Sequence, residues 1–280
     1  MIWRDVMPRV NLALKITNWC NLCCAHCCER SHAKEQLNLM PVGQIEKYIE
    51  QYKNMGIPVW DYITFTGGES MAPYFFNRGD YIPNISKICI NNGFAPAFKT
   101  NAKWNFGLTN RILKDIADVV HKNDCQISLD ISVDEYHDNL YDVANVIKQI
   151  MNSQYLSAAI PVTLVGLNTA ASQYKYNELV TLLRKQGIYV GPMESDGSFM
   201  VSYNDNLNVM FYDVGVLTRL GRAADNNLTS HTVMGKSNSG GSDCLMITND
   251  NKAILNYKYK TVVDNKTVGQ IYNELIQNKR

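Results

Sequence analysis

Six alternations of strand-like and helix-like sequence fill the first 190 residues, and they restrict the fold more than any other feature of the chain. In the first predicted strand, 10–16, large apolar residues alternate with Asn11, Ala13 and Lys15. Five more strands are predicted at 59–65, 94–100, 126–132, 159–167 and 188–190. Helices are predicted between them, around 45–55, 82–90, 112–120, 143–150 and 179–183. This order predicts an α/β fold with a parallel sheet, either open and doubly wound or closed into part of a barrel.

The sequence after Gly191 has a different character, because Ser, Asn and Gly dominate it. Residues 236–242 (KSNSGGS) are typical of a flexible connector. Beyond them we expect a hairpin formed by 244–247 and 253–257, turning at 249–251, and then a helix over 268–276. The chain is therefore predicted to consist of a barrel at 1–195 and a short C-terminal extension at 196–280.

Charge and hydropathy exclude several classes of protein. The net charge is +1, from 27 basic and 26 acidic residues, and there is no basic run interleaved with aromatic residues, so nucleic-acid binding is not indicated. The longest apolar stretch, 158–167, is too short to span a membrane and contains Pro161 and Gly166. The first ten residues lack the apolar core of a signal peptide. We expect a cytoplasmic protein without a membrane partner.

Five of the eight cysteines lie within nine positions directly after the first predicted strand: Cys20, Cys23, Cys24, Cys27 and Cys28. Clustered thiols in a reducing compartment favour a metal over disulfides. Cys20, Cys24 and Cys27 have the spacing C-x3-C-x2-C, and three thiolates on one loop can hold a four-iron cluster with one iron left open. The alternative is zinc, held by Cys20, Cys23, Cys27 and either His26 or Cys28.

The cysteine segment CNLCCAHC, together with FTGGES after the second strand, resembles the radical S-adenosylmethionine (radical SAM) superfamily. The resemblance covers about residues 10–195 and implies a partial (β/α)6 TIM-like barrel. It also implies a [4Fe-4S] cluster on the three cysteines, and SAM bound through its amino group by Gly67, Gly68 and Glu69. Glycines let the backbone approach a ligand closely, and a carboxylate can accept hydrogen bonds from an ammonium group.

Further SAM contacts follow from the same resemblance. His26 stands where the family commonly has an aromatic residue near the adenine. Thr100 and Asn101, in KTNA, match the family's TNG segment and are expected to contact SAM or substrate. Asn168, after the fifth strand, is expected near the adenine, although a strand-end cap is an equally simple interpretation.

The fourth strand carries an alternating pattern with a polar face. Ser128, Asp130, Ser132 and Asp134 alternate with large apolar residues, which places all four polar side chains on one side of the strand. Inward-facing carboxylates need partners, so we infer a polar cavity. The segment SVDEYH resembles the family's SAM-binding strand and favours Ser132 and Asp134 for the ribose and carboxylate, with Asp130 on the substrate side.

Four other polar residues have weaker signals. Lys99, His137 and Glu194 lie at predicted strand ends, where they could touch substrate, but surface ion pairing is the commoner role. Arg222, in GRAAD, could bind a carboxylate or phosphate, or could be structural.

The tail, 243–280, resembles a shortened version of the SPASM or twitch segment that follows the barrel in peptide-modifying members of the superfamily. That segment carries cysteines for auxiliary clusters, whereas this chain has only Cys244, and Asn256 stands where a second might be. One thiol cannot hold a conventional cluster, so a single cluster per chain is predicted. Cys244 is either a half-buried apolar side chain or a hydrogen-atom donor that quenches a substrate radical.

The sequence therefore predicts a radical SAM enzyme. Such an enzyme cleaves SAM reductively to a 5′-deoxyadenosyl radical and takes hydrogen from a substrate. It draws electrons from an external one-electron reductant of the flavodoxin or ferredoxin type. The tail favours a peptide or protein substrate over a small metabolite or nucleobase, and a glycyl-radical activase comes third. A non-catalytic zinc or iron-sulfur module is the alternative from another class. A hydrolase is not indicated, because neither G-x-S-x-G nor HExxH occurs.

Overall fold

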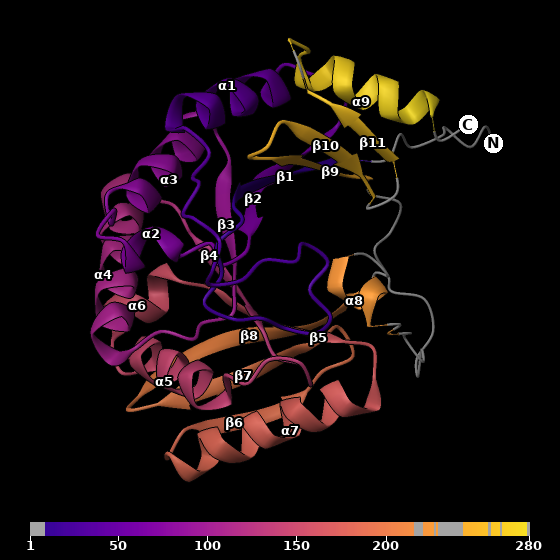
Figure 1. The fold of residues 1–280 in the computed structure, drawn as a ribbon. Helices are drawn as coiled ribbons and strands as arrows, with labels where there is room; N and C mark the ends of the chain where they lie inside the picture. The colour runs from indigo at the N-terminus through magenta and orange to yellow at the C-terminus, as the bar shows by residue number, and fades with distance from the viewer. Residues whose placement is uncertain are drawn as a thin grey trace, which may run out of the picture.

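The computed structural model describes residues 9–215, 221–226, 228, 243–256, 259–263 and 265–278. Its strands form one curved sheet in the order β11-β10-β9-β1-β2-β3-β4-β5-β8-β7-β6 (Figure 1). The α/β class and the partial TIM-like barrel expected from the sequence are confirmed, because a run of parallel strands makes up the centre of this sheet.

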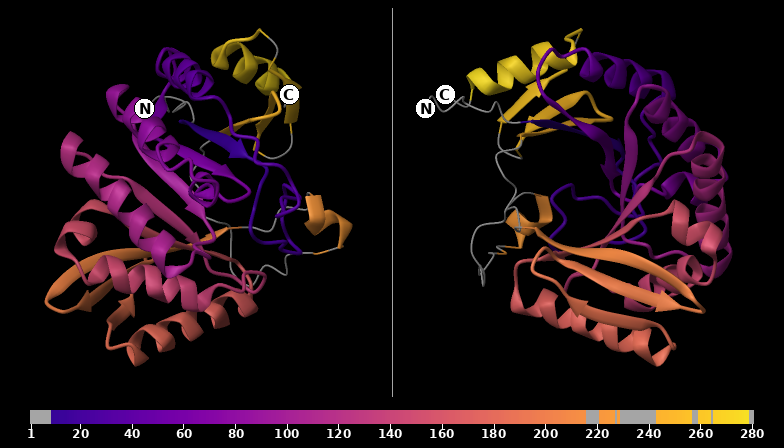
Figure 2. Two further views of the ribbon diagram at one scale, coloured as in Figure 1. Left: turned by 60° about the vertical axis from the view of Figure 1, so that its left-hand side comes forward. Right: turned by 180° about the vertical axis from the view of Figure 1, so that it is seen from behind.

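Five of the predicted strands lie side by side and parallel: β1 (Val10–Thr17), β2 (Val59–Gly67), β3 (Ala95–Thr100), β4 (Ser128–Ser132) and β5 (Val162–Leu167). The predicted connecting helices are α1 (Val42–Lys53), α3 (Tyr81–Asn91), α4 (Phe106–Asn123), α5 (Leu140–Met151) and α7 (Ala170–Lys185). They line the convex side of the sheet (Figure 2). Two short helices were not predicted, α2 (Ala72–Phe75) and α6 (Gln154–Ala159).

The prediction of the sixth parallel strand at 188–190 was wrong. The strand that pairs in parallel with β5 is β8 (Asn206–Gly215), in the stretch after Gly191 where the sequence analysis predicted no strand before the C-terminal hairpin. Residues 188–190 contribute instead to β6 (Tyr189–Met193), which pairs antiparallel with β7 (Ser198–Tyr203), and β7 pairs antiparallel with β8. The sheet therefore continues past residue 195, and a domain division at that position stays a prediction.

The C-terminal hairpin and helix are confirmed. β9 (Asp243–Thr248) and β10 (Lys252–Leu255) form the hairpin, β11 (Tyr259–Val262) extends it, and α9 (Val268–Gln277) follows. A capping box between Thr267 and Gln270 begins α9. β9 also pairs in parallel with β1, so the extension continues the barrel sheet. The predicted connector at 236–242 and Tyr257 lie outside the described residues.

The two faces of the parallel strands differ as the sequence predicted. In β4, Leu129 and Ile131 are fully buried on the helix-covered side, while Ser128, Asp130 and Ser132 are only half-buried on the inner side. The inner face of the sheet is therefore polar in this region. Among the described helices, none has the length and apolar content needed to cross a bilayer.

Candidate active site

The cysteine loop, residues 18–41, leads from β1 to α1 at the carboxyl end of β1. Within this loop, the one β-bridge is a parallel bridge between Trp19 and His32. Cys20 is buried, whereas Cys24 and Cys27 are half-buried and Cys23 is exposed. Cys27 N donates to Cys24 O at 3.2 Å and turns the loop back on itself. The three predicted ligands thus lie on one compact loop at the expected edge of the sheet.

Cys20 is held in place by polar contacts to its sulfur. Its Sγ accepts from the amide N of Leu22 at 3.4 Å and from Nδ2 of Asn101 at 3.5 Å. Burial, and next the charge of Glu69, raise the pKa of this thiol to about 12. The metal-free protein therefore keeps Cys20 protonated at neutral pH, and metal binding has to displace that proton.

Cys24 lies beside two imidazoles. Its sulfur and the ring nitrogens of His26 and His137 all lie within 4.8 Å of one another. A thiol and two imidazoles suit a single borderline metal ion. The sequence grouped Cys24 with Cys20 and Cys27 instead. Thiols that bind different irons of one cluster lie farther apart than the ligands of one ion. The closeness of Cys24, His26 and His137 therefore does not test the iron-sulfur ligand set, and Cys20, Cys24 and Cys27 stay the predicted ligands.

The glycine pair after β2 contacts the chain itself. A Cβ on Gly67, whose φ is +142°, would lie 2.3 Å from Thr17 O, and one on Gly68 would lie 2.0 Å from Trp19 O. Gly68 N and Glu69 N donate to these same two carbonyl oxygens, both at 2.9 Å. Both positions therefore require glycine, because the backbone after β2 packs against the backbone at Thr17 and Trp19 with no room for a Cβ.

Glu69 is completely buried beside this contact. Its carboxylate accepts from Thr100 Oγ1 at 2.6 Å, from Asn101 N at 2.9 Å and from Met71 N at 3.0 Å. Burial raises the pKa of Glu69 in spite of these donors. Within the described part of the chain, no ion pair reaches this carboxylate. A buried carboxylate with donors but no cation is suited to receive an ammonium group.

Asn101 connects this carboxylate to the cysteine loop. Its Nδ2 donates to Asn21 Oδ1 at 2.9 Å as well as to the Cys20 sulfur, and its Oδ1 accepts from Lys103 N at 2.8 Å. Asn139 was not predicted, yet it is buried and its Nδ2 donates to the carbonyls of Asn101 and Ser132. Asn139 therefore connects the ends of β3 and β4. The sequence gives no sign of this role, because a single Asn before a helix is common.

Asp134 lies just after β4 and is already paired. Its carboxylate accepts from Tyr136 N at 2.9 Å and lies 2.8 Å from Nδ1 of His137. Burial favours the neutral form of Asp134, but the hydrogen bond and charge of His137 outweigh it and lower the pKa of Asp134. Burial also favours the neutral form of His137, but the hydrogen bond and charge of Asp134 raise the pKa of His137 to about 10. His26 Nε2 lies 3.8 Å from Asp134, and burial lowers the pKa of His26 to about 4.

The ring of His26 is stacked on Tyr136, with centroids 4.7 Å apart and planes 23° apart. The predicted adenine-stacking residue thus has an aromatic partner from SVDEYH. Ser132 is half-buried on the inner face, and Asn168 follows β5 at the same edge. Glu194 lies in the turn between β6 and β7. The SAM roles assigned to these residues stay predictions.

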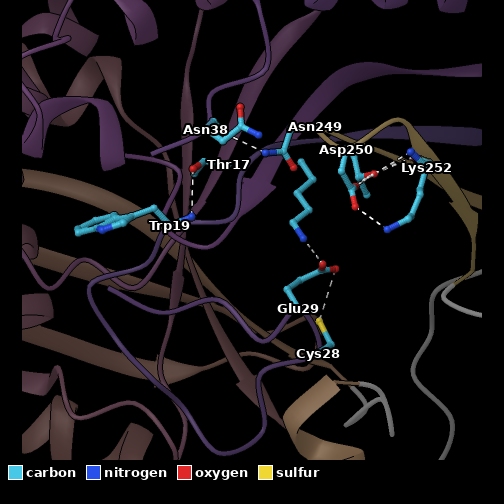
Figure 3. Close-up of polar contacts among 10 residues, drawn as sticks. Thr17, Trp19, Cys28, Glu29, Asn38, Asn249, Asp250 and Lys252 are labelled. Atoms are coloured by element: carbon cyan, nitrogen blue, oxygen red, sulfur yellow. Dashed lines mark hydrogen bonds and ion pairs between the residues drawn. The ribbon is translucent and has the colours of Figure 1, made fainter. Parts of the chain in front are cut away.

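A second set of contacts, missed by the sequence analysis, holds the far end of the cysteine loop (Figure 3). Lys15, buried on the inner side of β1, forms an ion pair with Glu29, and the Cys28 thiol lies 4.0 Å from the same carboxylate. Burial, then the charge of Glu29, raise the pKa of Cys28 to about 12. Asn249, in the β9–β10 turn, donates to Asn38 O at 2.9 Å. The sequence did contain a signal for this ion pair, because Lys15 is the one charged residue in β1 and a buried lysine needs a partner.

Cys244 lies on β9, directly opposite Asn11 of β1. Its neighbour Leu245 is buried, with Leu12 as its partner, so the half-buried Cys244 side chain points to the inner face. Burial raises the pKa of its thiol, and Lys99 opposes that shift. Asn256 Oδ1 accepts from Cys244 N at 2.8 Å, so Asn256 closes the hairpin at this point. Its role as a hydrogen-atom donor stays a prediction.

These residues fit the group that the resemblance implies. The loop offers three thiols, which are the ligands that iron-sulfur clusters use. Beside them, Glu69 supplies a buried carboxylate that lacks a cation, as the ammonium group of an amino acid requires. The two features are joined through Asn101.

The model of the Radical SAM superfamily matches residues 14–164, just over half of the chain. No curated protein matches the sequence. Two solved structures with this fold are native anSMEcpe with bound AdoMet and a peptide, and a histidine-tagged form of anSMEcpe with bound AdoMet. Their TM-scores are 0.54 and 0.53 at 12% and 13% identity, and each match covers 95% of this chain and 80% of the other. Streptococcus suis SuiB bound to S-adenosylmethionine matches at a TM-score of 0.46 and 11% identity, over 95% of this chain and 66% of that one.

Proposed function

The chain belongs to the radical SAM superfamily, and on that premise we propose that it is an enzyme that modifies a peptide or protein by radical chemistry. The family implies one resident [4Fe-4S] cluster, SAM, a substrate and an electron donor. When bound, the cluster and SAM supply a 5′-deoxyadenosyl radical after one-electron reduction.

The proposed roles of the chain's own residues follow from the site. Cys20, Cys24 and Cys27 hold the cluster. Glu69, with the ends of β2 and β3 around it, takes the ammonium group of SAM in place of the cation that it lacks. His26 and the residues after β4 and β5, which are Ser132, Asp134 and Asn168, enclose the nucleoside and exclude water.

The observation that favours a peptide is an apolar surface on the inner face of the sheet. Lys99, Asp130, Thr163 and Phe211 are successive partners across β3, β4, β5 and β8, so they lie in one row on that face. Lys99 Nζ lies 3.6 Å from Asp130. The row thus begins at a charged pair beside the site and ends at an aromatic side chain.

Beyond Phe211 the same face stays apolar and exposed. Phe211, Val209 and Leu207 alternate along β8, and Met200 of β7 is the partner of Val209. Their exposed fractions are 44%, 47%, 64% and 48%. The other side of these strands is buried through Met210 and Tyr212, and α7 lies on that outer side (Figure 2). We name this set, Met200, Leu207, Val209 and Phe211, the inner apolar surface.

An exposed apolar surface of this kind is typical of a binding site. A small polar metabolite bound at the Lys99–Asp130 pair leaves the inner apolar surface exposed to water. A peptide can place a polar group at the charged pair and a Leu- or Phe-like side chain on the inner apolar surface. One protein of the same fold, anSMEcpe, has been solved with a peptide, which supports this choice of substrate class.

The test is anaerobic reconstitution with iron and sulfide, followed by SAM, dithionite and a pool of synthetic peptides rich in Leu and Phe. A matched pool carries Ser at those positions. We expect 5′-deoxyadenosine formation above the substrate-free background with the apolar pool only. The double variant Val209→Ser, Phe211→Ser should weaken the response at least about tenfold, because it removes two apolar side chains that the peptide would bury.

The control is Tyr141→Ser, which changes an apolar residue that is 77% exposed on α5, on the convex side. It should respond as the unaltered enzyme does. Equal responses to both pools, or equal loss in the control, contradict the role of the inner apolar surface, and no response to either pool contradicts the peptide assignment. Stimulation by metabolites or nucleobases alone favours the small-molecule alternative. A colourless zinc protein that leaves SAM intact favours the non-catalytic module.

A further inference from the structure

The short helix α8 (Gly221–Asp225) contacts the cysteine loop almost entirely through the loop's main chain. The guanidinium group of Arg222 donates from Nε to Cys24 O at 2.8 Å and from Nη2 to Ser31 O at 2.7 Å. The amide N of Arg222 donates to Cys27 O at 2.9 Å. Asn226, just after the helix, donates from Nδ2 to Ala25 O at 2.9 Å. Four loop carbonyls are thus bound from one helical turn.

A return contact runs from the loop to the helix. Arg30 donates from Nε and Nη2 to the two carboxylate oxygens of Asp225, both at 2.8 Å. Both side chains are at least half exposed, so this pair is worth little by itself. Arg222 is half-buried, and within the described part of the chain its guanidinium group has no carboxylate within 4.0 Å. The guanidinium group is therefore free to serve the loop carbonyls.

The loop depends on such outside contacts. Residues 24–31 contain no helix or strand, so most of their carbonyl groups have no partner within the loop. Within this segment, a backbone hydrogen bond joins Cys27 N to Cys24 O, and Cys24 O also accepts a hydrogen bond from Arg222. The ion pair between Lys15 and Glu29 is a further outside contact, which holds the loop from β1.

We propose that α8 is a clamp on the cysteine loop, with Arg222 as the positioning residue that holds the main chain of Cys24 and Cys27 where both thiols can bind one cluster. The guanidinium group suits this task because its planar fork donates in two fixed directions and so bridges two carbonyls seven residues apart. A lysine keeps the charge but can replace only one of the two contacts. The geometry, rather than the charge alone, therefore defines the role.

The first experiment uses the metal-free protein, so it does not depend on the proposed function. Cys20 is buried at the start of the cysteine loop, and Cys89 is buried in the helix layer on α3. Both are alkylated with iodoacetamide under native conditions, and each rate is measured by mass spectrometry. We expect Arg222→Gln and Arg222→Lys to speed the alkylation of Cys20 about tenfold, because both lose hydrogen bonds to the loop, while the rate at Cys89 stays unchanged.

The matched control is Arg184→Gln, because Arg184 Nη2 donates to a main-chain carbonyl, Val190 O, at 2.8 Å on the far side of the barrel. It should change neither rate. A joint rise at Cys20 and Cys89 in the Arg222 variants would mean general destabilisation and overturn the clamp. No rise at Cys20, or a wild-type rate with Arg222→Lys, would also overturn it.

A second readout uses the reconstituted protein without substrate or SAM. Release of iron to a chelator should be about tenfold faster in Arg222→Gln than in Arg184→Gln, as expected from the loss of two charge-assisted hydrogen bonds. Equal release rates contradict the proposal. If no variant binds iron, the proposed function fails, but the alkylation rates still decide whether α8 clamps the loop.

Discussion

The contact between Gly68 and the cysteine loop gives the sharpest prediction for stability. In Gly68→Ala the new Cβ would lie 2.0 Å from Trp19 O and 2.5 Å from its carbonyl carbon. Both atoms belong to the backbone, so the two segments must separate by about 1 Å to restore a normal contact. That separation stretches the bonds from Glu69 N to Trp19 O and from Gly68 N to Thr17 O, each 2.9 Å long.

The expected cost follows from these two effects. Overpacking typically costs about 1–3 kcal/mol. Two weakened hydrogen bonds add about 1 kcal/mol each. Together they predict a loss of about 3–5 kcal/mol in the free energy of unfolding, which lowers Tm by roughly 6–20 °C in a chain of this size.

The assay combines urea unfolding of the metal-free protein with iron content after reconstitution. Gly68→Ala should lose both stability and iron, since the displaced segment begins the loop that carries Cys20. Gly43→Ala is the control, because Gly43 lies in α1, where an added Cβ would have no other atom within 4 Å, and this variant should gain up to about 1 kcal/mol. Unchanged unfolding and iron content in Gly68→Ala would refute the argument.

Three further predictions concern single side chains. Cys27→Ala should abolish the brown chromophore of the reconstituted protein, as should loss of either other predicted ligand, while Cys28→Ala should retain it; the opposite pattern would reassign the ligands. Burial raises the pKa of Glu69, so its ionisation favours the unfolded chain, and wild-type stability falls as pH rises from the unfolded toward the folded pKa. Glu69→Gln removes this dependence, so the variant should gain stability relative to wild type as the pH of urea unfolding rises from 4 to 7. A difference in the free energy of unfolding that is the same at both pH values would contradict this prediction. Cys244→Ala should leave SAM cleavage intact and block product formation if Cys244 donates hydrogen, and an unchanged product yield would dispose of that role.

Local patterns were sufficient for the central strands. In β4, the alternation of Asp130 and Ser132 with Leu129 and Ile131 predicted which side faces the helices, because side-chain direction in a strand depends only on sequence parity. The hairpin of β9 and β10 was also predictable, since polar residues between two apolar runs signal a turn.

Pairing between distant strands was not predictable. β8 contains a good apolar run, but only the assembled sheet shows that it, rather than the segment at 188–190, lies next to β5. The edge strand β6 and its neighbour β7 present exposed apolar residues, so their pattern does not match that of strands with a polar, solvated face.

The sequence by itself determined the α/β class, the positions of five parallel strands, the cysteine triplet and the Gly-Gly-Glu turn, because each depends on residues close together in the chain. The tertiary structure alone decided that Gly67 and Gly68 accommodate the backbone at Thr17 and Trp19, and that Arg222 binds carbonyls almost 200 residues away. These are contacts between segments that become neighbours only when the chain folds. Their energies depend on distance in space, which spacing along the chain does not encode.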